Sequence, residues 1–116
     1  MILAVLDDLM FTSKIRTTAA QLGVAVTFAR SRDAALAEMR KTRPSLVIMD
    51  LNNPRTQPLA IVGAMKDDAA LASIPTVGYA SHVQTDVIEA ARAAGVQDVL
   101  ARSAFTQQLP AILQRQ

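Results

Sequence analysis

The chain contains no cysteine and no tryptophan, and aromatic residues make up only 3% of its 116 positions. Without cysteine, it can form neither a disulfide bond nor a thiolate metal site. The shortage of aromatic rings argues against a surface that stacks nucleobases or flavins. No apolar run approaches the roughly 18 residues that span a bilayer, and the N-terminus lacks the basic segment of a signal peptide. These absences favour a cytoplasmic protein.

The composition suits one folded domain that covers residues 1–116. Apolar residues make up 51% of the chain, which is enough to fill a core, and the length fits a single domain. Twelve basic and ten acidic side chains leave a net charge of +2. The basic residues are scattered and form no stripe, which argues against nucleic-acid binding.

Short apolar runs alternate five times with segments of helical period. The predicted strands cover residues 2–6, 24–28, 46–49, 76–79 and 96–101. The predicted helices cover residues 9–22, 32–42 and 59–71, then a segment capped by Ser81 or Thr85 that ends at 94, and finally 104–114. Strands that alternate with helices of this length form right-handed βαβ units and a parallel sheet. The predicted fold class is therefore α/β.

Two expectations concern the predicted helices. Leu59, Val62 and Met65 recur at helical spacing and are expected to face the core. Pro110 lies near the first turn of the final helix if Thr106 is the N-cap. If the helix begins earlier, the proline should kink it, because it removes a backbone donor from the interior.

Three aspartates follow buried strands and carry the strongest functional signal. Asp7 and Asp8 follow the first strand, and Asp50 follows the third. Open α/β sheets bind ligands at the carboxyl ends of their strands, and carboxylates that converge there repel one another unless a cation or a proton intervenes. The pattern therefore predicts a divalent metal site, with one carboxylate available as a nucleophile. The alternative is structural: one of the paired aspartates caps a helix, and Asp50 starts a turn.

Four motifs in order along the whole chain resemble the receiver domain of bacterial two-component response regulators. They are Asp7-Asp8, residues 50–54 (DLNNP), residues 74–77 (IPTV) and residues 95–100 (GVQDVL). The resemblance implies a flavodoxin-like, three-layer fold in which five parallel strands take the order 2-1-3-4-5. It also implies a signalling protein and not an enzyme.

The resemblance assigns roles to five residues. Asp50 matches the phosphoacceptor, and Arg102 stands in place of the family's lysine. Asp7 and Asp8 match the acidic pair that holds Mg²⁺, and Asn52 matches the position whose backbone carbonyl also binds the metal. This set suits phosphoryl transfer, which depends mostly on positioning and charge neutralisation.

Several positions depart from the family's pattern. Ala80 replaces the hydroxyl residue that ends the fourth strand, and Val99 replaces the aromatic residue on the fifth. Ser103 replaces a proline after the lysine position, and Pro58 replaces a loop glycine. Arginine at 102 keeps the charge but has a planar, bulkier head group. These changes predict an atypical receiver that does not switch by the usual route, because a switch needs contacts that differ between its two states.

Three functions are compatible with these residues. The first is a single-domain receiver that takes a phosphoryl group from a histidine kinase or phosphotransfer protein and signals to a downstream protein. It could also form a homodimer through the face made by the fourth helix, fifth strand and fifth helix. The second is a pseudo-receiver that acts as an interaction module without phosphorylation. The third is a small flavodoxin-like enzyme or cofactor binder, which Asp7-Asp8 disfavours because a phosphate-binding loop would be needed there.

Overall fold

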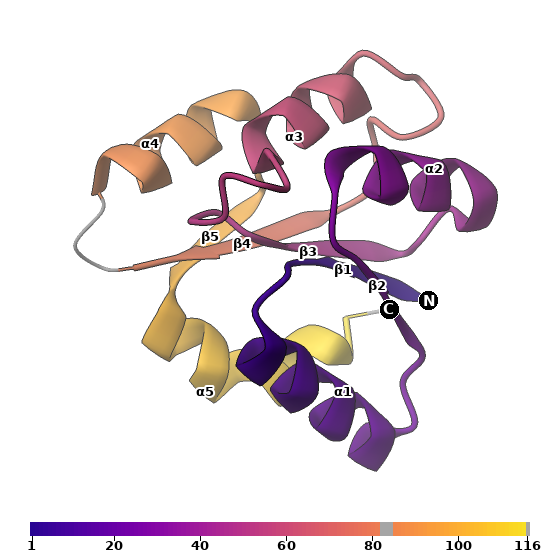
Figure 1. Cartoon of the computed structure of the whole chain (residues 1–116), viewed down its shortest axis with the longest axis vertical. Helices are drawn as coiled ribbons and strands as arrows, with labels where there is room; N and C mark the ends of the chain where they lie inside the picture. The colour runs from indigo at the N-terminus through magenta and orange to yellow at the C-terminus, as the bar shows by residue number, and fades with distance from the viewer. Residues whose placement is uncertain (82–84, 116) are drawn as a thin grey trace.

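The structure is a computed structural model of the chain, and it describes residues 1–81 and 85–115. Five parallel strands form one sheet in the order β2-β1-β3-β4-β5 (Figure 1). The strands are β1 (Ile2–Val5), β2 (Val26–Ala29), β3 (Leu46–Asp50), β4 (Thr76–Ala80) and β5 (Asp98–Ala101). The helices are α1 (Leu9–Leu22), α2 (Arg32–Thr42), α3 (Pro58–Lys66), α4 (Thr85–Ala94) and α5 (Arg102–Leu113). The predicted fold class and strand order are confirmed.

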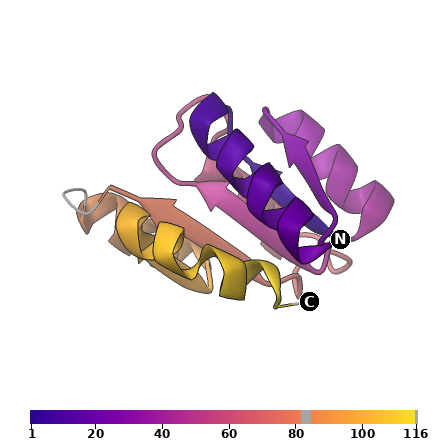
Figure 2. The ribbon, with the colours of Figure 1, turned by 90° about the horizontal axis from the view of Figure 1, so that it is seen from below.

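The helices cover both faces of the sheet, so the molecule has three layers. Helices α2, α3 and α4 lie on one face, and α1 and α5 lie side by side on the other (Figures 1 and 2). Side chains alternate along each strand between these two layers. In β1, Leu3 and Val5 join the core under α2 and α3, whereas Ile2 and Ala4 join the core under α1 and α5. Both faces of the central strands are therefore buried, as their continuous apolar runs predicted.

Helix α3 ends earlier than predicted, at Lys66 instead of residue 71. Asp68 stops it: its side-chain oxygen accepts a bond from the Ala70 N–H at 2.9 Å, and its backbone carbonyl accepts from the Leu71 N–H. An aspartate that binds nearby backbone groups favours a turn over a helix. Leu71 is fully buried even so, which explains why its hydrophobic spacing looked helical.

The boundary differences of two residues lie at strand and helix starts, and other ends differ by one residue. Strand β2 begins at Val26 and β5 at Asp98, each two residues later than predicted, because the residues after Gly23 and Gly95 still close the preceding helices. Both glycines have positive φ, which favours glycine at a helix end. The prediction that Leu59 is buried is wrong: it is 39% exposed, although Val62 and Met65 are buried.

Helix α5 begins at Arg102, two residues before the predicted start, and Ala101 is its N-cap residue. Thr106 is therefore not the N-cap; its hydroxyl donates to the Arg102 carbonyl oxygen inside the helix. Pro110 lies in the helix interior, and the helix continues to Leu113. The early start also places Arg102 at the carboxyl end of the sheet.

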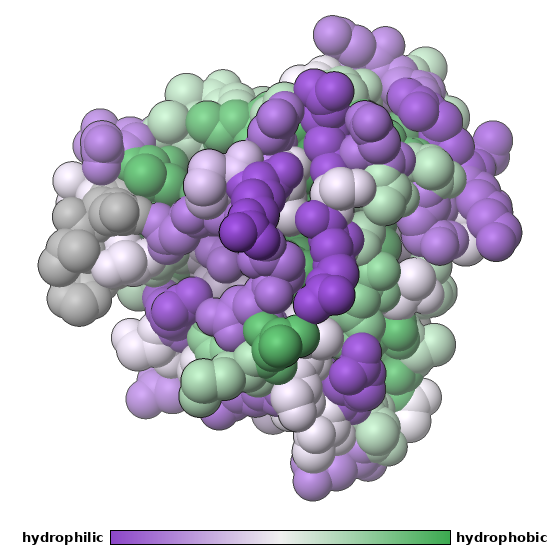
Figure 3. Space-filling model, viewed as in Figure 1, coloured by the Kyte–Doolittle hydropathy of each residue, from purple (hydrophilic) through white to green (hydrophobic). Residues whose placement is uncertain are grey.

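The surface seen in Figure 3 is mostly hydrophilic at its centre, and hydrophobic residues there are interrupted by polar ones. Among the described residues, Leu9, Met10 and Leu59 are the large hydrophobic side chains with high exposure. No helix within residues 1–81 and 85–115 is both long and apolar enough to cross a membrane. His82, the chain's single histidine, lies outside the described residues. Thr85, one of the two residues predicted to cap the fourth helix, is the first residue of α4.

Candidate functional site

The acidic residues meet at the carboxyl edge of the sheet. Strands β1 and β3 are neighbours in register, with Val5 opposite Met49, so the loop after β1 and the end of β3 lie side by side. Asp50 is the last residue of β3 and pairs with Tyr79 of β4. The carboxyl ends of parallel strands lie at one edge of the sheet. At this edge β1 leads to α1 on one face and β3 leads to α3 on the other (Figure 1).

Asp50 is nearly buried, with 5% of its surface exposed. Its Oδ1 accepts a hydrogen bond from the Asn52 N–H at 2.9 Å. Burial raises the pKa of Asp50 above its ordinary value; the Asn52 N–H and Arg102 oppose this shift, and the charges on Asp8 and Asp7 add to it. The three carboxylates therefore lie close enough to act on one another. The turn expected as the alternative for Asp50 is also present, because the Asn52 bond closes it.

Asp8 is the N-cap residue of α1, as the structural alternative predicted. Its Oδ1 accepts from the Met10 and Phe11 N–H groups at 2.9 and 3.1 Å. Its Oδ2 lies 3.9 Å from a guanidinium nitrogen of Arg102. Asp8 thus fixes the start of α1 with one oxygen and keeps the other directed to the site.

Asp7 is held by two residues of the β3–α3 loop that sequence reasoning did not assign to the site. Its Oδ1 accepts from the Asn53 side-chain amide, and its Oδ2 lies 3.6 Å from Nη1 of Arg55. Asn53 is buried, and its own Oδ1 accepts from the Arg55 N–H at 2.9 Å. The sequence offered one signal for these two residues: Asn53 and Arg55 follow Asp50 by three and five positions in the same loop.

The carboxylates do not stand ready as metal ligands. Within residues 1–81 and 85–115, no three acidic or histidine side chains are arranged so that they could hold an ion. The donor set itself fits a hard divalent cation, which prefers carboxylate and carbonyl oxygens completed by water. Asp7 and Asp8 would need to exchange some of their present partners for the metal.

Arg102 links the acidic site to an aromatic cluster of Phe11, Tyr79 and Phe105. Its guanidinium carbon lies 4.7 Å from the centre of the Phe11 ring and 5.9 Å from that of Tyr79. Tyr79 stacks on Phe105 at 4.5 Å and meets Phe11 edge-on at 5.0 Å. Arg102 therefore joins α1, β4 and α5 while it lowers the pKa of Asp50. The sequence indicated the arginine but not this cluster.

The positions predicted to be atypical lie around the same edge. Ala80 ends β4, is fully buried and pairs with Ala101 of β5. Val99 is buried within β5 at 9% exposure. The Ser81 N–H donates to Oδ1 of Asn52 at 2.7 Å, so the side chain of Asn52 connects the β3–α3 loop to the end of β4. The prediction had assigned Asn52 only a backbone carbonyl.

Comparison with known families decides the relationship. The model of the response regulator receiver domain matches residues 2–114. The chain belongs to the response regulator receiver family. The comparison with curated proteins gives no match.

Solved structures support the receiver fold over nearly the whole chain. The chemotaxis response regulator CheY4 of Vibrio cholerae is 24% identical, with a TM-score of 0.84 over 98% of this chain and 95% of that one. A response regulator of Hahella chejuensis is 22% identical, with a TM-score of 0.86 over 97% and 90%. The Mn²⁺-bound form of response regulator Rcp1 is 20% identical, with a TM-score of 0.82 over 99% and 95%.

Proposed function

We propose that this receiver accepts a phosphoryl group on Asp50 within two-component signalling and passes the signal on through protein contacts. The observation that carries the proposal is the placement of Asp50 at the end of β3, nearly buried and within electrostatic reach of Asp7, Asp8 and Arg102. Attack requires the ionised carboxylate. The Asn52 N–H and Arg102 favour that form against the effect of burial.

The phosphoryl donor is the phosphohistidine of a histidine kinase or a phosphotransfer protein. An oxygen of Asp50 forms a bond to phosphorus while the bond between phosphorus and the imidazole nitrogen breaks, and the released imidazole takes up a proton. Arg102 lies within electrostatic reach of Asp50, so it can compensate negative charge on the phosphoryl oxygens. A guanidinium can donate two parallel hydrogen bonds to such oxygens.

The expected cofactor is Mg²⁺, held by Asp7, Asp8, Asp50 and the backbone carbonyl of Asn52. When bound, a divalent cation neutralises charge on the phosphoryl oxygens. Support comes from the oxygen-only donor set and from the Mn²⁺-bound form of the structural neighbour Rcp1. The cation also relieves the repulsion among the three carboxylates, which otherwise adds to the raised pKa of Asp50.

A second candidate is a pseudo-receiver that binds partners without phosphorylation. Two observations favour it. Ala80 and Val99 are small, buried and without a hydroxyl group or an aromatic ring, so they offer no usual readout of a charge on Asp50. Asp7 and Asp8 are already satisfied by Asn53, Arg55, Arg102 and the start of α1. In both cases we infer a bacterial, cytoplasmic protein whose downstream contact or homodimer uses the face formed by α4, β5 and α5.

An NMR titration with beryllofluoride and Mg²⁺ tests the proposal, since beryllofluoride mimics a phosphoryl group on aspartate. Amide signals of Leu51, Asn52 and the start of α5 should shift, and Asp50→Ala should abolish the shifts. Phosphorylation by a small-molecule phosphodonor should add one phosphoryl group to the wild-type mass and none to the variant. If beryllofluoride leaves the spectrum unchanged at millimolar Mg²⁺, the pseudo-receiver function replaces the phosphoacceptor function.

A further inference from the structure

One oxygen of Asp7 is covered by a cation from the chain itself, the guanidinium of Arg55. The two oxygens of Asp7 have different partners. Oδ1 is bound by the amide of Asn53, a buried neutral group that can stay in place when a metal binds. Oδ2 faces Nη1 of Arg55 at 3.6 Å. Of these two partners only Arg55 carries a positive charge, and it lies where a divalent cation on Oδ2 would be repelled.

We propose that Arg55 sets the divalent-cation affinity of the site by competing for Oδ2 of Asp7. The proposal rests on the metal site described under the proposed function. Metal binding then exchanges one cation on Asp7 for another. Arg55 is a competitor and takes no part in phosphoryl transfer.

The loop that carries Arg55 suits this exchange. The Arg55 N–H is fixed by Oδ1 of Asn53 at 2.9 Å, so the backbone stays close to Asp7. The side chain is 83% exposed and can turn into solvent without leaving a buried group unpaired. Asn53 therefore has two effects: its side-chain amide nitrogen orients Asp7, and its side-chain oxygen Oδ1 holds the backbone of Arg55 nearby.

Arg102 does not compete in the same way. It lies 3.9 Å from Oδ2 of Asp8, but its guanidinium also packs over Phe11 and Tyr79. Moving it away would forfeit these ring contacts, whereas Arg55 forfeits only an exposed ion pair. The two arginines next to the acidic pair therefore differ in how easily they yield to a metal.

The test compares Mn²⁺ binding to the wild-type chain with binding to Arg55→Gln and Arg55→Lys, by isothermal titration calorimetry at low and high salt. The Gln variant should bind Mn²⁺ about three- to tenfold more tightly at low salt, because a guanidinium displaced to roughly 7–10 Å from a divalent ion still repels it by about this factor in water. At high salt the gain should shrink to about twofold or less. The Lys variant keeps the charge and should stay near the wild type.

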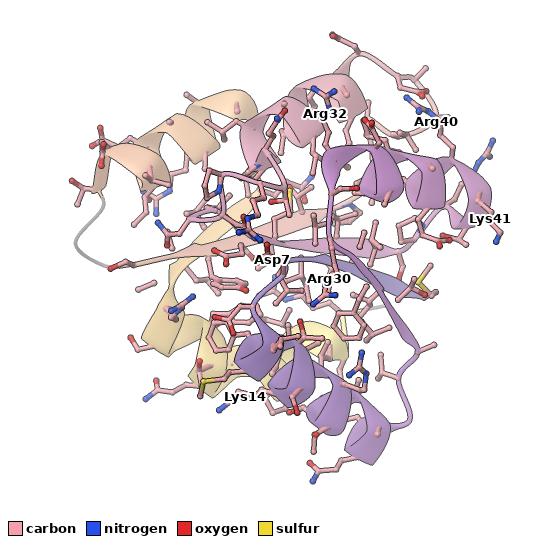
Figure 4. All side chains as sticks on the ribbon, viewed as in Figure 1. Asp7, Lys14, Arg30, Arg32, Arg40 and Lys41 are labelled. Carbon is pink, nitrogen blue, oxygen red and sulfur yellow. The ribbon has the colours of Figure 1, made fainter. Side chains whose placement is uncertain are left out.

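Arg32→Gln is the matched control because it removes the same charge from another exposed arginine. Arg32 is paired with Asp33 and Gln57, and Figure 4 shows it beside α2, well apart from Asp7. It should change Mn²⁺ affinity much less than Arg55→Gln does. Equal affinity of Arg55→Gln and the wild type, or a weaker affinity of the variant, overturns the role of Arg55 and leaves the metal site standing. If none of the four proteins binds Mn²⁺ at millimolar concentration, both the inference and the proposed metal site are wrong.

Discussion

Replacement of Asp50 by asparagine should stabilise the protein at neutral pH. The Asp50 carboxylate is 5% exposed. Burial raises its pKa, and the charges on Asp8 and Asp7 add to the shift, while the Asn52 N–H and Arg102 compensate only in part. An asparagine keeps an oxygen that can accept the Asn52 bond, but it brings no charge out of water. The wild-type residue therefore costs stability in its ionised form.

The size and the pH dependence of this effect follow from proton linkage. Each unit by which the pKa of a group is raised on folding corresponds to about 1.4 kcal/mol at a pH above both values. Stabilising substitutions commonly add about 0.5–2 kcal/mol, and we expect Asp50→Asn to fall in this range. The folded protein binds the Asp50 proton more tightly than the unfolded chain does. Wild-type stability is therefore lost as the pH rises from about 3.9, the ordinary value, through the raised pKa, and the gain in the variant develops over the same interval.

Urea unfolding of both proteins at pH 4 and pH 7, followed by circular dichroism, measures the difference. Asp33→Asn is the control, because its side chain is 89% exposed and it removes the same charge; a surface change of this kind should stay within about 0.5 kcal/mol. The gain for Asp50→Asn should be clear at pH 7 and small at pH 4. A variant that is no more stable than the wild type at pH 7, or whose gain does not depend on pH, would refute the reasoning.

Three further substitutions test other parts of the site. Arg102→Lys keeps the charge but loses the planar stacking on the rings beneath it, so unfolding free energy measured in urea should fall by about 0.5–1 kcal/mol; an unchanged value would mean that the stacking is not stabilising. Gly78→Ala should destabilise by about 1–3 kcal/mol in the same assay, because its new Cβ would lie 2.7 Å from Cδ1 of Leu51; a neutral effect would show that Leu51 repacks without cost. Ala80→Thr restores a hydroxyl at the end of β4, and beryllofluoride with Mg²⁺ should then shift the amide signal of Ser81 more than in the wild type; equal shifts would count against a readout role for this position.

The sequence was sufficient to predict the sheet because its signals were local and repeated. Buried strands were marked by continuous apolar runs, and two helix ends were marked by Gly23 and Gly95, both of which adopt positive φ. Element boundaries were predicted wrongly where a single polar contact ended an element whose hydrophobic pattern continued. Asp68 ends α3 through bonds to its own neighbours, and hydrophobic spacing carries no information about such bonds. The start of α5 at Arg102 was missed because no capping side chain marks it.

Within the site, the sequence indicated which residues converge but not which partners they choose. Asp7, Asp8 and Asp50 could be placed at one edge because parallel strands end together. The same reasoning offered both a cap and a metal ligand for Asp8, and the structure shows the cap. The bonds from Asn53 and Arg55 to Asp7 join residues more than forty positions apart. Such contacts depend on how one loop folds over another, and the sequence showed only that both residues follow Asp50 closely in a loop.

The balance of charge at this edge explains how the chain can keep three acidic residues close together. Three carboxylates that converge without a counter-charge would destabilise the fold. This chain places Arg102 beside Asp8 and Asp50, and Arg55 beside Asp7, so it reduces the repulsion with its own cations. A planar guanidinium at 102 can stack on aromatic rings while it compensates the charge of the carboxylates. A lysine ammonium stacks on aromatic rings less well. Arginine at position 102 is therefore physically linked to the aromatic cluster beneath it, and Arg102→Lys tests that link directly.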